Sequence, residues 1–352
     1  MSQLSAFLNP GEVILISCCN LGSFGSRYSL AALTTEGISW LNLDDAINPS
    51  TDIGVTGIAA TEKDCFVAVQ GKQPRILSLG RDLRVNGQFE CKQAQDIHSL
   101  AERDGSLYIV STARNQVVSI DCKGGALFAG EKGQEKIAFA GSITKEDATH
   151  LNSICFIDGG AMLVSMFGIK WRADARLGAI FDVSNGTTVH RNIGEPHSLT
   201  YLPSGVVTFC ESRTSSFCLL EPGSGSLRKV CLSGYTRGST FTGRHFVVGA
   251  SCRRVKSRST ASFNEMPASR DPHGNSWQRS SLYFLNPDLS TALHLDFTSY
   301  APEIYDIVFL GNRFTPSELF RDAAARRIDA MHDEIRRTSD YFGLVSHRRA
   351  SE

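Results

Sequence analysis

A unit of roughly 40–50 residues that recurs along the chain constrains the fold more than any other feature. Each copy is a run of short apolar segments separated by turns rich in Gly, Asp and Pro, and each begins on a segment of similar pattern. These first segments lie at 54–58, 96–100, 150–154, 195–199, 235–239 and 304–310. A repeat of this length with four short strands is typical of one blade of a β-propeller, and six copies predict six blades.

The last copy is incomplete, and the N-terminus supplies what it lacks. Residues 304–310 hold one strand-like segment, whereas 12–19, 28–35 and 38–43 hold three such segments before the first copy. We expect these four strands to form one blade, because joining the two ends closes the ring and leaves no open edge. The predicted fold is an all-β, six-bladed propeller over residues 1–314, closed by N-terminal strands and a C-terminal strand.

The C-terminal residues 315–352 have a different pattern. Thr315, Pro316 and Glu318 match the N-cap, first and third positions of a helix. Apolar residues then recur at helical spacing as far as 335. We predict a short helical extension, one or two helices over 316–338 docked on the propeller, followed by a tail.

Charge and composition exclude several classes of function. The 36 basic and 36 acidic side chains give a net charge of zero, which argues against a nucleic-acid partner. No apolar run approaches the roughly 20 residues that span a bilayer, so no membrane partner is expected. Ten cysteines without a CxxC pair, and a start without signal-peptide features, favour reduced thiols and a cytoplasmic location. The glycine-rich phosphate loop, the nucleophile elbow and the HExxH zinc motif do not occur.

Histidines gather at the predicted channel, which the first strand of each blade lines. Aligning the copies places five residues at one position: Thr56, His98, Asn152, His197 and Arg237. His150 lies two residues before Asn152, and residues two apart on a strand face the same side. We therefore expect His98, His150 and His197 at the channel mouth, where three imidazoles could hold a divalent Fe, Cu or Zn ion. In the alternative, these histidines hold no metal and hydrogen-bond to neighbouring blades.

Other channel residues are candidates for substrate binding and catalysis. Arg237 could anchor a carboxylate or phosphate, because a guanidinium pairs with either through two hydrogen bonds; in the alternative it forms an inter-blade salt bridge. Glu211 begins a loop at the channel face and could serve as a base or fourth ligand, and Asn152 is a further catalytic candidate. Because adjacent strand residues face opposite ways, we expect only one of Tyr305 and Asp306 to reach the channel, and we assign Tyr305 to substrate binding.

Loops between the second and third strands form the predicted rim. They carry Arg114, Trp171 and Arg172, which we assign to substrate binding, and the long Ser- and Arg-rich stretch 253–279. A loop of that length is commonly a lid, a binding loop or a disordered segment.

The segments 96–100, 150–152, 196–198, 235–238 and 304–306 occur in the same order in a family of uncharacterised bacterial proteins. The chain resembles that family, a domain of unknown function with a predicted propeller fold, over residues 75–312. Family members often have Asp in place of Ser99 and a longer Gly-rich loop in place of 171–177. The resemblance implies the propeller and the same channel residues, and it implies no reaction.

Three functional hypotheses follow from the sequence. The first is a metal-dependent enzyme that acts on a small-molecule or peptide substrate in the channel. We expect this substrate to be anionic because the Arg237 guanidinium favours an anion. The second is a non-catalytic binding or scaffold propeller. The third is a metal-free lyase or cyclase in which the channel histidines act as acid and base.

Overall fold

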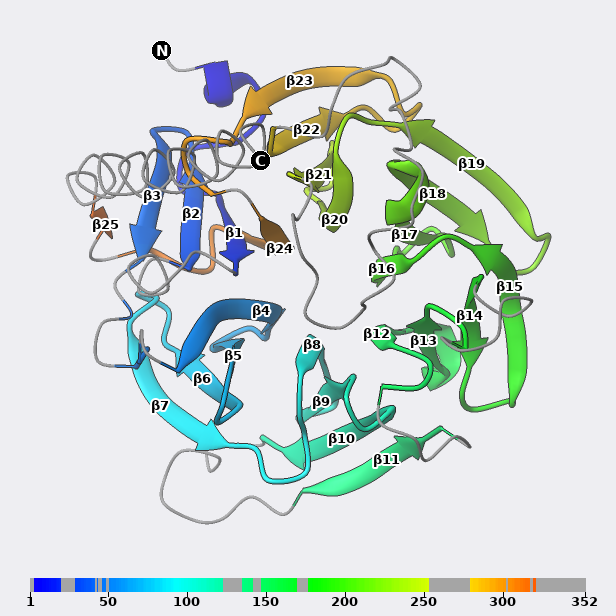
Figure 1. Cartoon of the computed structure of the whole chain (residues 1–352). Coiled ribbons are helices and arrows are strands. Elements are labelled where there is room, and N and C mark those ends of the chain that lie inside the picture. The colour runs from blue at the N-terminus through cyan, green and yellow to red at the C-terminus, as the bar shows by residue number, and fades with distance from the viewer. Residues whose placement is uncertain are drawn as a thin grey trace, which may run out of the picture.

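The computed structural model describes residues 3–19, 29–41, 43, 46–48, 51–122, 135–141, 147–169, 177–252, 279–301, 303–316 and 319–320. These residues form six antiparallel sheets arranged as a ring around a central channel (Figure 1). The predicted six-bladed propeller is confirmed. No helix in these ranges is long and apolar enough to cross a membrane.

Five blades follow the chain order, with the first strand of each innermost. Blade 1 is β4 (Asp52–Ala60), β5 (Cys65–Gly71), β6 (Arg75–Leu79) and β7 (Val85–Glu90). Blade 2 is β8 (Ile97–Arg103), β9 (Ser106–Ser111), β10 (Gln116–Asp121) and β11 (Lys136–Ala140). Blade 3 is β12 (Leu151–Phe156), β13 (Met162–Met166), β14 (Gly178–Asp182) and β15 (Thr187–Ile193), with the 3₁₀ turn η4 (Asp158–Gly160) between β12 and β13.

Blades 4 and 5 repeat the arrangement. Blade 4 is β16 (Pro196–Tyr201), β17 (Val207–Glu211), β18 (Ser216–Glu221) and β19 (Ser226–Cys231), with η6 (Ser212–Thr214) after β17. Blade 5 is β20 (Tyr235–Phe241), β21 (Phe246–Ser251), β22 (Ser281–Leu285) and β23 (Thr291–Asp296).

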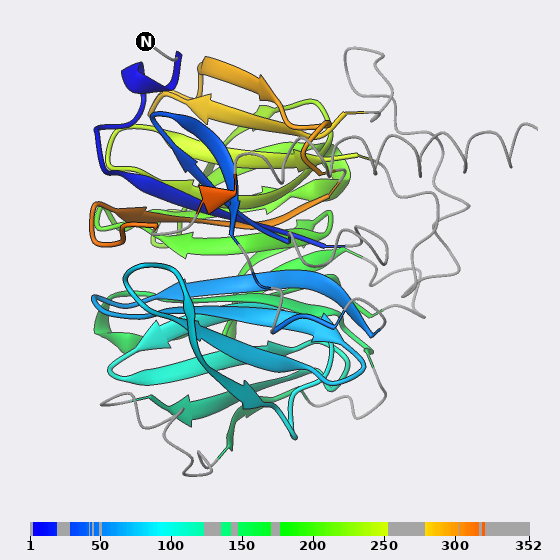
Figure 2. The ribbon, with the colours of Figure 1, turned by 90° about the vertical axis from the view of Figure 1, so that its left-hand side faces the viewer.

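Blade 6 joins the two ends of the chain. Its innermost strand is β24 (Ile304–Gly311), which pairs with β1 (Val13–Cys18), followed by β2 (Leu30–Thr34) and β3 (Gly37–Leu41). Ile16 lies opposite Ile307 in the antiparallel β1–β24 ladder. A short 3₁₀ turn, η1 (Gln3–Ala6), precedes β1 (Figure 2), and its Leu4 belongs to the buried cluster shared by blades 5 and 6. The expected closure of the ring by N-terminal strands is therefore confirmed.

The C-terminal extension differs from the prediction where it can be compared. Leu319 and Phe320 form β25, a two-residue strand that pairs with β3. The outer strand of a blade offers unpaired backbone groups, so a short segment can satisfy them as a strand instead of starting a helix. The rest of the helices predicted over 316–338 lies outside the described residues.

The hydrophobic core is divided into layers between neighbouring blades. Each of six buried clusters joins residues of two adjacent blades; one, for example, joins Leu15 of β1 to Val67 of β5 across the closure. Side chains alternate between the two faces of each strand, so every blade packs on both of its neighbours. This packing holds the six innermost strands around the channel.

A ring of hydroxyl groups fastens the inner ends of the blades. At each interface a buried Ser or Thr donates to a backbone carbonyl of the next innermost strand. The donors are Ser17, Thr56, Thr112, Ser165, Ser212 and Ser251, and the acceptors are Thr56, Ile97, Leu151, Pro196, Thr236 and Ile304, in that order. Thr56, which the alignment places with the channel residues, thus turns its hydroxyl into a blade interface.

Candidate functional site

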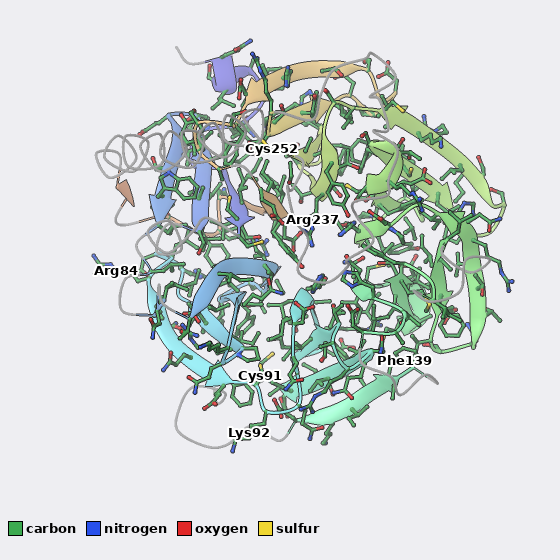
Figure 3. All side chains as sticks on the ribbon, viewed as in Figure 1. Arg84, Cys91, Lys92, Phe139, Arg237 and Cys252 are labelled. Carbon is green, nitrogen blue, oxygen red and sulfur yellow. The ribbon has the colours of Figure 1, made fainter. Side chains whose placement is uncertain are left out.

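A small pocket lies at the channel, where innermost strands of neighbouring blades meet. About 210 Å³ of space without protein atoms lies in this pocket, and that volume includes open solvent. Four residues that the alignment places at one position line it with Tyr305: His98, Asn152, His197 and Arg237. Figure 3 shows the Arg237 side chain near the centre of the ring. The structure therefore brings together side chains that come from five different blades.

A β-bulge in the innermost strands turns a second side chain of several strands toward the pocket. The pairing of the two inner strands shifts register at this level in all six blades. As a result Ser99, Ser153, Ser198 and Asp306 line the pocket beside the residues that precede them. The expectation that only one of Tyr305 and Asp306 reaches the channel is wrong, because alternation is broken at a bulge.

His98 and His197 are buried and held through the same ring nitrogen. His98 Nδ1 lies 3.0 Å from the Asp96 carbonyl oxygen, and His197 Nδ1 lies 2.9 Å from the Glu195 carbonyl oxygen. The Ser212 hydroxyl is also 2.7 Å from His197 Nδ1. A carbonyl oxygen can only accept, so Nδ1 carries the proton and Nε2 keeps its lone pair.

Burial keeps both imidazoles neutral. It lowers the pKa of His98 to about 3, against an opposing effect of Asp96. Burial, followed by the nearby Arg237 charge, lowers the pKa of His197 well below its usual value. At neutral pH these rings therefore act as hydrogen-bond acceptors or ligands, and they are poor proton carriers.

His150 sits outside the pocket lining. Its Nδ1 is 2.9 Å from an Asp147 carboxylate oxygen, and its ring packs edge-on to His98 at 4.9 Å between centroids. Its backbone φ is 49°, in the left-handed region, like that of Asp96 and Glu195 at the same place in their blades. Because this residue precedes the extended strand, the rule that residues two apart face the same side does not place it beside Asn152.

Arg237 forms a buried ion pair against an aromatic ring. Its Nη1 donates to the Glu303 carboxylate over 2.9 Å, and its guanidinium carbon lies 3.6 Å from the Tyr305 ring centre. Of the two predicted roles, the inter-blade salt bridge is thus present. Arg237 is also one of the residues that line the pocket.

Two buried donors at the pocket lack an acceptor. Asn152 Nδ2 and Arg237 Nε have no hydrogen-bond partner among the described residues. An unsatisfied buried donor costs roughly 1–3 kcal/mol, and such groups are rare in native proteins. Both residues line the same pocket, so one small ligand with acceptor oxygens could satisfy both.

Two carboxyl groups near the pocket have raised pKa values. Burial raises the pKa of Glu195, whose carboxylate accepts a hydrogen bond of 3.0 Å from Tyr235. Burial raises the pKa of Asp306 to about 7, against two backbone amide donors and Arg237. Sequence reasoning missed both groups as site residues. Glu195 lies two residues before a channel residue, as Asp96 and Glu303 do, and this repeated position could have marked it.

The remaining predicted site residues lie elsewhere. Glu211 accepts hydrogen bonds from the Gly194 amide at 3.0 Å and from Lys229 at 3.3 Å, and so faces its own blade. Arg114 is exposed in the turn between β9 and β10. Trp171 and Arg172, and the stretch 253–278, lie outside the described residues.

The three histidines converge without forming a ready metal site. Among the ranges that the structure describes, no group of three or more His, Cys, Asp and Glu side chains is arranged to hold a metal ion. The Phe167 ring packs against both His150 and His197, with centroids 4.3 and 4.9 Å away. The rings would have to move to share one ion.

Comparisons with known proteins agree with this fold. A family model described as "Domain of unknown function (DUF4915)" matches residues 88–319, more than half of the chain. A chain in a crystal structure titled as a nidogen/laminin complex aligns with a TM-score of 0.57 at 10% identity, covering 86% of this chain and 99% of that one. A protein of unknown function from Bacteroides caccae aligns with a TM-score of 0.53 at 12% identity, covering 84% and 97%. At these identities the likeness extends to the fold alone. The search of curated proteins gives no significant match.

Proposed function

Because the chain belongs to the family described as a domain of unknown function (DUF4915), whose description names no reaction, we propose from the site itself that the protein is an enzyme that binds a small anionic substrate in its channel pocket. The observation that carries this proposal is the pair of unpartnered buried donors, Asn152 Nδ2 and Arg237 Nε, on one pocket. Donors held in place before the ligand arrives are the usual means of stabilising an oxyanion in a site that excludes water. A guanidinium among them favours a carboxylate or phosphate.

Neutral histidines would recognise a second group on the same substrate. Nδ1 of His98 and of His197 is already occupied, so Nε2 is the nitrogen left to accept a hydrogen bond. A hydroxyl or amine hydrogen beside the anionic group would suit such an acceptor. The substrate class is therefore a small carboxylate or phosphate that carries a neighbouring hydroxyl or amine.

A metal ion remains the second candidate, favoured by how the imidazoles are held. Histidine ligands almost always donate their other ring N–H to a carbonyl or carboxylate, which fixes the tautomer. His98, His150 and His197 all have Nδ1 in such a contact. Fe, Cu or Zn bound at their Nε2 atoms would act as a Lewis acid toward the substrate.

Ligand-induced stabilisation tests the primary proposal. Glycolate and inorganic phosphate are the probes, because they represent the two anion types and glycolate also carries a hydroxyl. We expect glycolate to raise the melting temperature of the wild-type protein. The double variant Arg237→Met/Glu303→Gln, which removes the guanidinium without leaving a buried charge, should lose this shift. Arg228→Met, on the exposed strand β19, is the matched control and should keep it.

The alternatives give different results. Stabilisation by phosphate alone would assign the site to a phosphate ester, whereas no shift with either probe would contradict the anion pocket and favour a scaffold role. Metal content is measured separately after loading with Zn, Fe(II) or Cu(II) and dialysis. One ion per chain in the wild type that His197→Asn abolishes would support the metal candidate, and a content far below one would contradict it.

A further inference from the structure

Asp306 links two blades through a carboxyl group at a level where other blades are linked through a serine hydroxyl. Its Oδ2 accepts the Ile58 amide of blade 1 at 3.0 Å, and so links blade 6 to blade 1. At the same level of other blades a serine makes the link. Ser153 accepts the Leu199 amide at 3.2 Å, and Ser198 accepts the Gly238 amide at 2.9 Å. The charge of Asp306 therefore has a reason other than blade packing.

Asp306 is surrounded by one cation, one buried thiol and two buried histidines. Arg237 of β20 is the cation that faces it, Cys210 of β17 is a buried thiol nearby, and His98 and His197 line the same pocket. β4 approaches with the Ile58 amide and β1 with the Ser17 hydroxyl, neither of which titrates near neutral pH. Tyr305, the neighbour on its own strand, stacks on Arg237.

A negative charge on Asp306 would have no cation of its own among the residues that line the pocket. The Arg237 charge is matched by Glu303 at 2.9 Å, and the two lining histidines are neutral because burial lowers their pKa values. An ionised Asp306 would then add one negative charge to the pocket that is to receive an anion. Two like charges in one buried pocket repel strongly, and the carboxyl can remove that repulsion by taking a proton.

We propose that Asp306 is the proton carrier of the channel pocket, so that each anion binds together with one proton on its carboxyl group. This inference rests on the proposed function, since it requires the pocket to bind an anion. The acid–base role of the site then belongs to Asp306, and the histidines serve in recognition. Binding is proton-linked, and the affinity for the anion falls as the solution pH rises above the pKa that Asp306 has in the ligand-free protein.

Calorimetric titration with glycolate from pH 6.0 to 8.5 tests the proposal on the full chain. Repeating each titration in two buffers of different ionisation enthalpy counts the protons taken up. The wild type should lose about tenfold in affinity per pH unit above neutrality and take up about one proton per ion at pH 8. Asp306→Ser, which copies the link of blades 3 and 4, should bind with less than about a twofold change over this range and no proton uptake. Asp306→Asn, the neutral isostere, should behave in the same way.

Control and contrary outcomes separate this inference from the function on which it rests. Asp288→Ser, on an outer turn, should titrate like the wild type. Equal pH dependence in the wild type and both Asp306 variants would overturn the proton-carrier role while leaving the anion pocket intact. Loss of glycolate binding in both folded variants at every pH would also overturn it. No glycolate binding by the wild type at any pH would overturn the proposed function itself, and this inference with it.

Discussion

Arg237 and Glu303 form an ion pair of 2.9 Å at the channel, and each side chain is 6% exposed. The pair joins blade 5 to the start of blade 6. Because both side chains are buried, water cannot solvate one charge if the other is removed. The pair also holds the guanidinium in one position, and its Nε still lacks an acceptor. Burying two charges costs desolvation free energy, and the fixed position of the guanidinium is what this cost provides.

Breaking the pair should be far more costly than removing it. We expect Arg237→Met to lower the free energy of unfolding by about 3–5 kcal/mol, because it leaves the Glu303 charge buried alone. Arg237→Met/Glu303→Gln should recover most of that loss. Urea unfolding of both variants measures the difference. The exposed pair Arg279–Asp296, at 3.5 Å, is the control, and Arg279→Met should change stability by less than about 1 kcal/mol. Equal losses in the single and double variants would show that a Glu303 charge left buried alone is not what destabilises Arg237→Met.

Replacing Asn152 by an apolar residue should preserve or raise stability and abolish anion binding. Its Nδ2 is buried without a partner, so Asn152→Leu, of similar volume, removes an unsatisfied donor. We expect this variant to be as stable as the wild type or more stable by up to about 1 kcal/mol, and to lose the glycolate-induced shift. Thermal unfolding with and without glycolate measures both effects. A destabilised variant that still binds glycolate would contradict the role of Asn152 as an anion donor.

The blades were predictable because each copy carries the same apolar pattern and turns. The role of residues 12–43 followed from the single strand left at 304–310, and the pairing of Ile16 with Ile307 confirms it. The alignment also placed His98 and Arg237 at one level of the channel. These predictions depend on periodicity, which the sequence displays directly.

The details that a bulge controls were not predictable in the same way. Alternation excluded Asp306 from the channel, whereas the bulge in β24 brings it to the pocket. The left-handed backbone at His150 likewise removes that ring from the lining. Ser99, Ser153 and Ser198, small residues at matching places in three copies, were a signal of the bulge. Whether Glu211 faced the channel depended on Lys229 two strands away, which no local pattern reveals.

Acid should destabilise the fold through its buried histidines. In the unfolded chain His98 titrates near its ordinary pKa of about 6.5, whereas in the fold burial lowers its pKa to about 3. The unfolded state therefore binds more protons between these values, and stability falls as pH is lowered from about 6.5 to 3. At pH 4.5 the loss from one such group is about 2–3 kcal/mol.

The variant His98→Gln measures this effect. The difference in unfolding free energy between pH 7.5 and 4.5 should shrink by about 2–3 kcal/mol relative to the wild type. His190→Gln, on the outer strand β15, is the control and should leave more of that difference intact. An unchanged difference in His98→Gln would mean that His98 does not stay neutral in the fold.

The Ser and Thr hydroxyls that link the inner ends of the blades should contribute measurably to the free energy of unfolding. Ser251 Oγ donates to the Ile304 carbonyl oxygen at 2.9 Å and accepts the Ile304 amide at 3.1 Å, all within a buried interface. Ser251→Ala leaves both backbone groups without that partner, so we expect a loss of about 1–3 kcal/mol in the free energy of unfolding. Ser224→Ala, in an exposed turn of blade 4, should change stability by less than about 0.5 kcal/mol. If urea unfolding gave equal values for the two variants, the Ser251 hydroxyl would contribute nothing measurable to the link between blades 5 and 6.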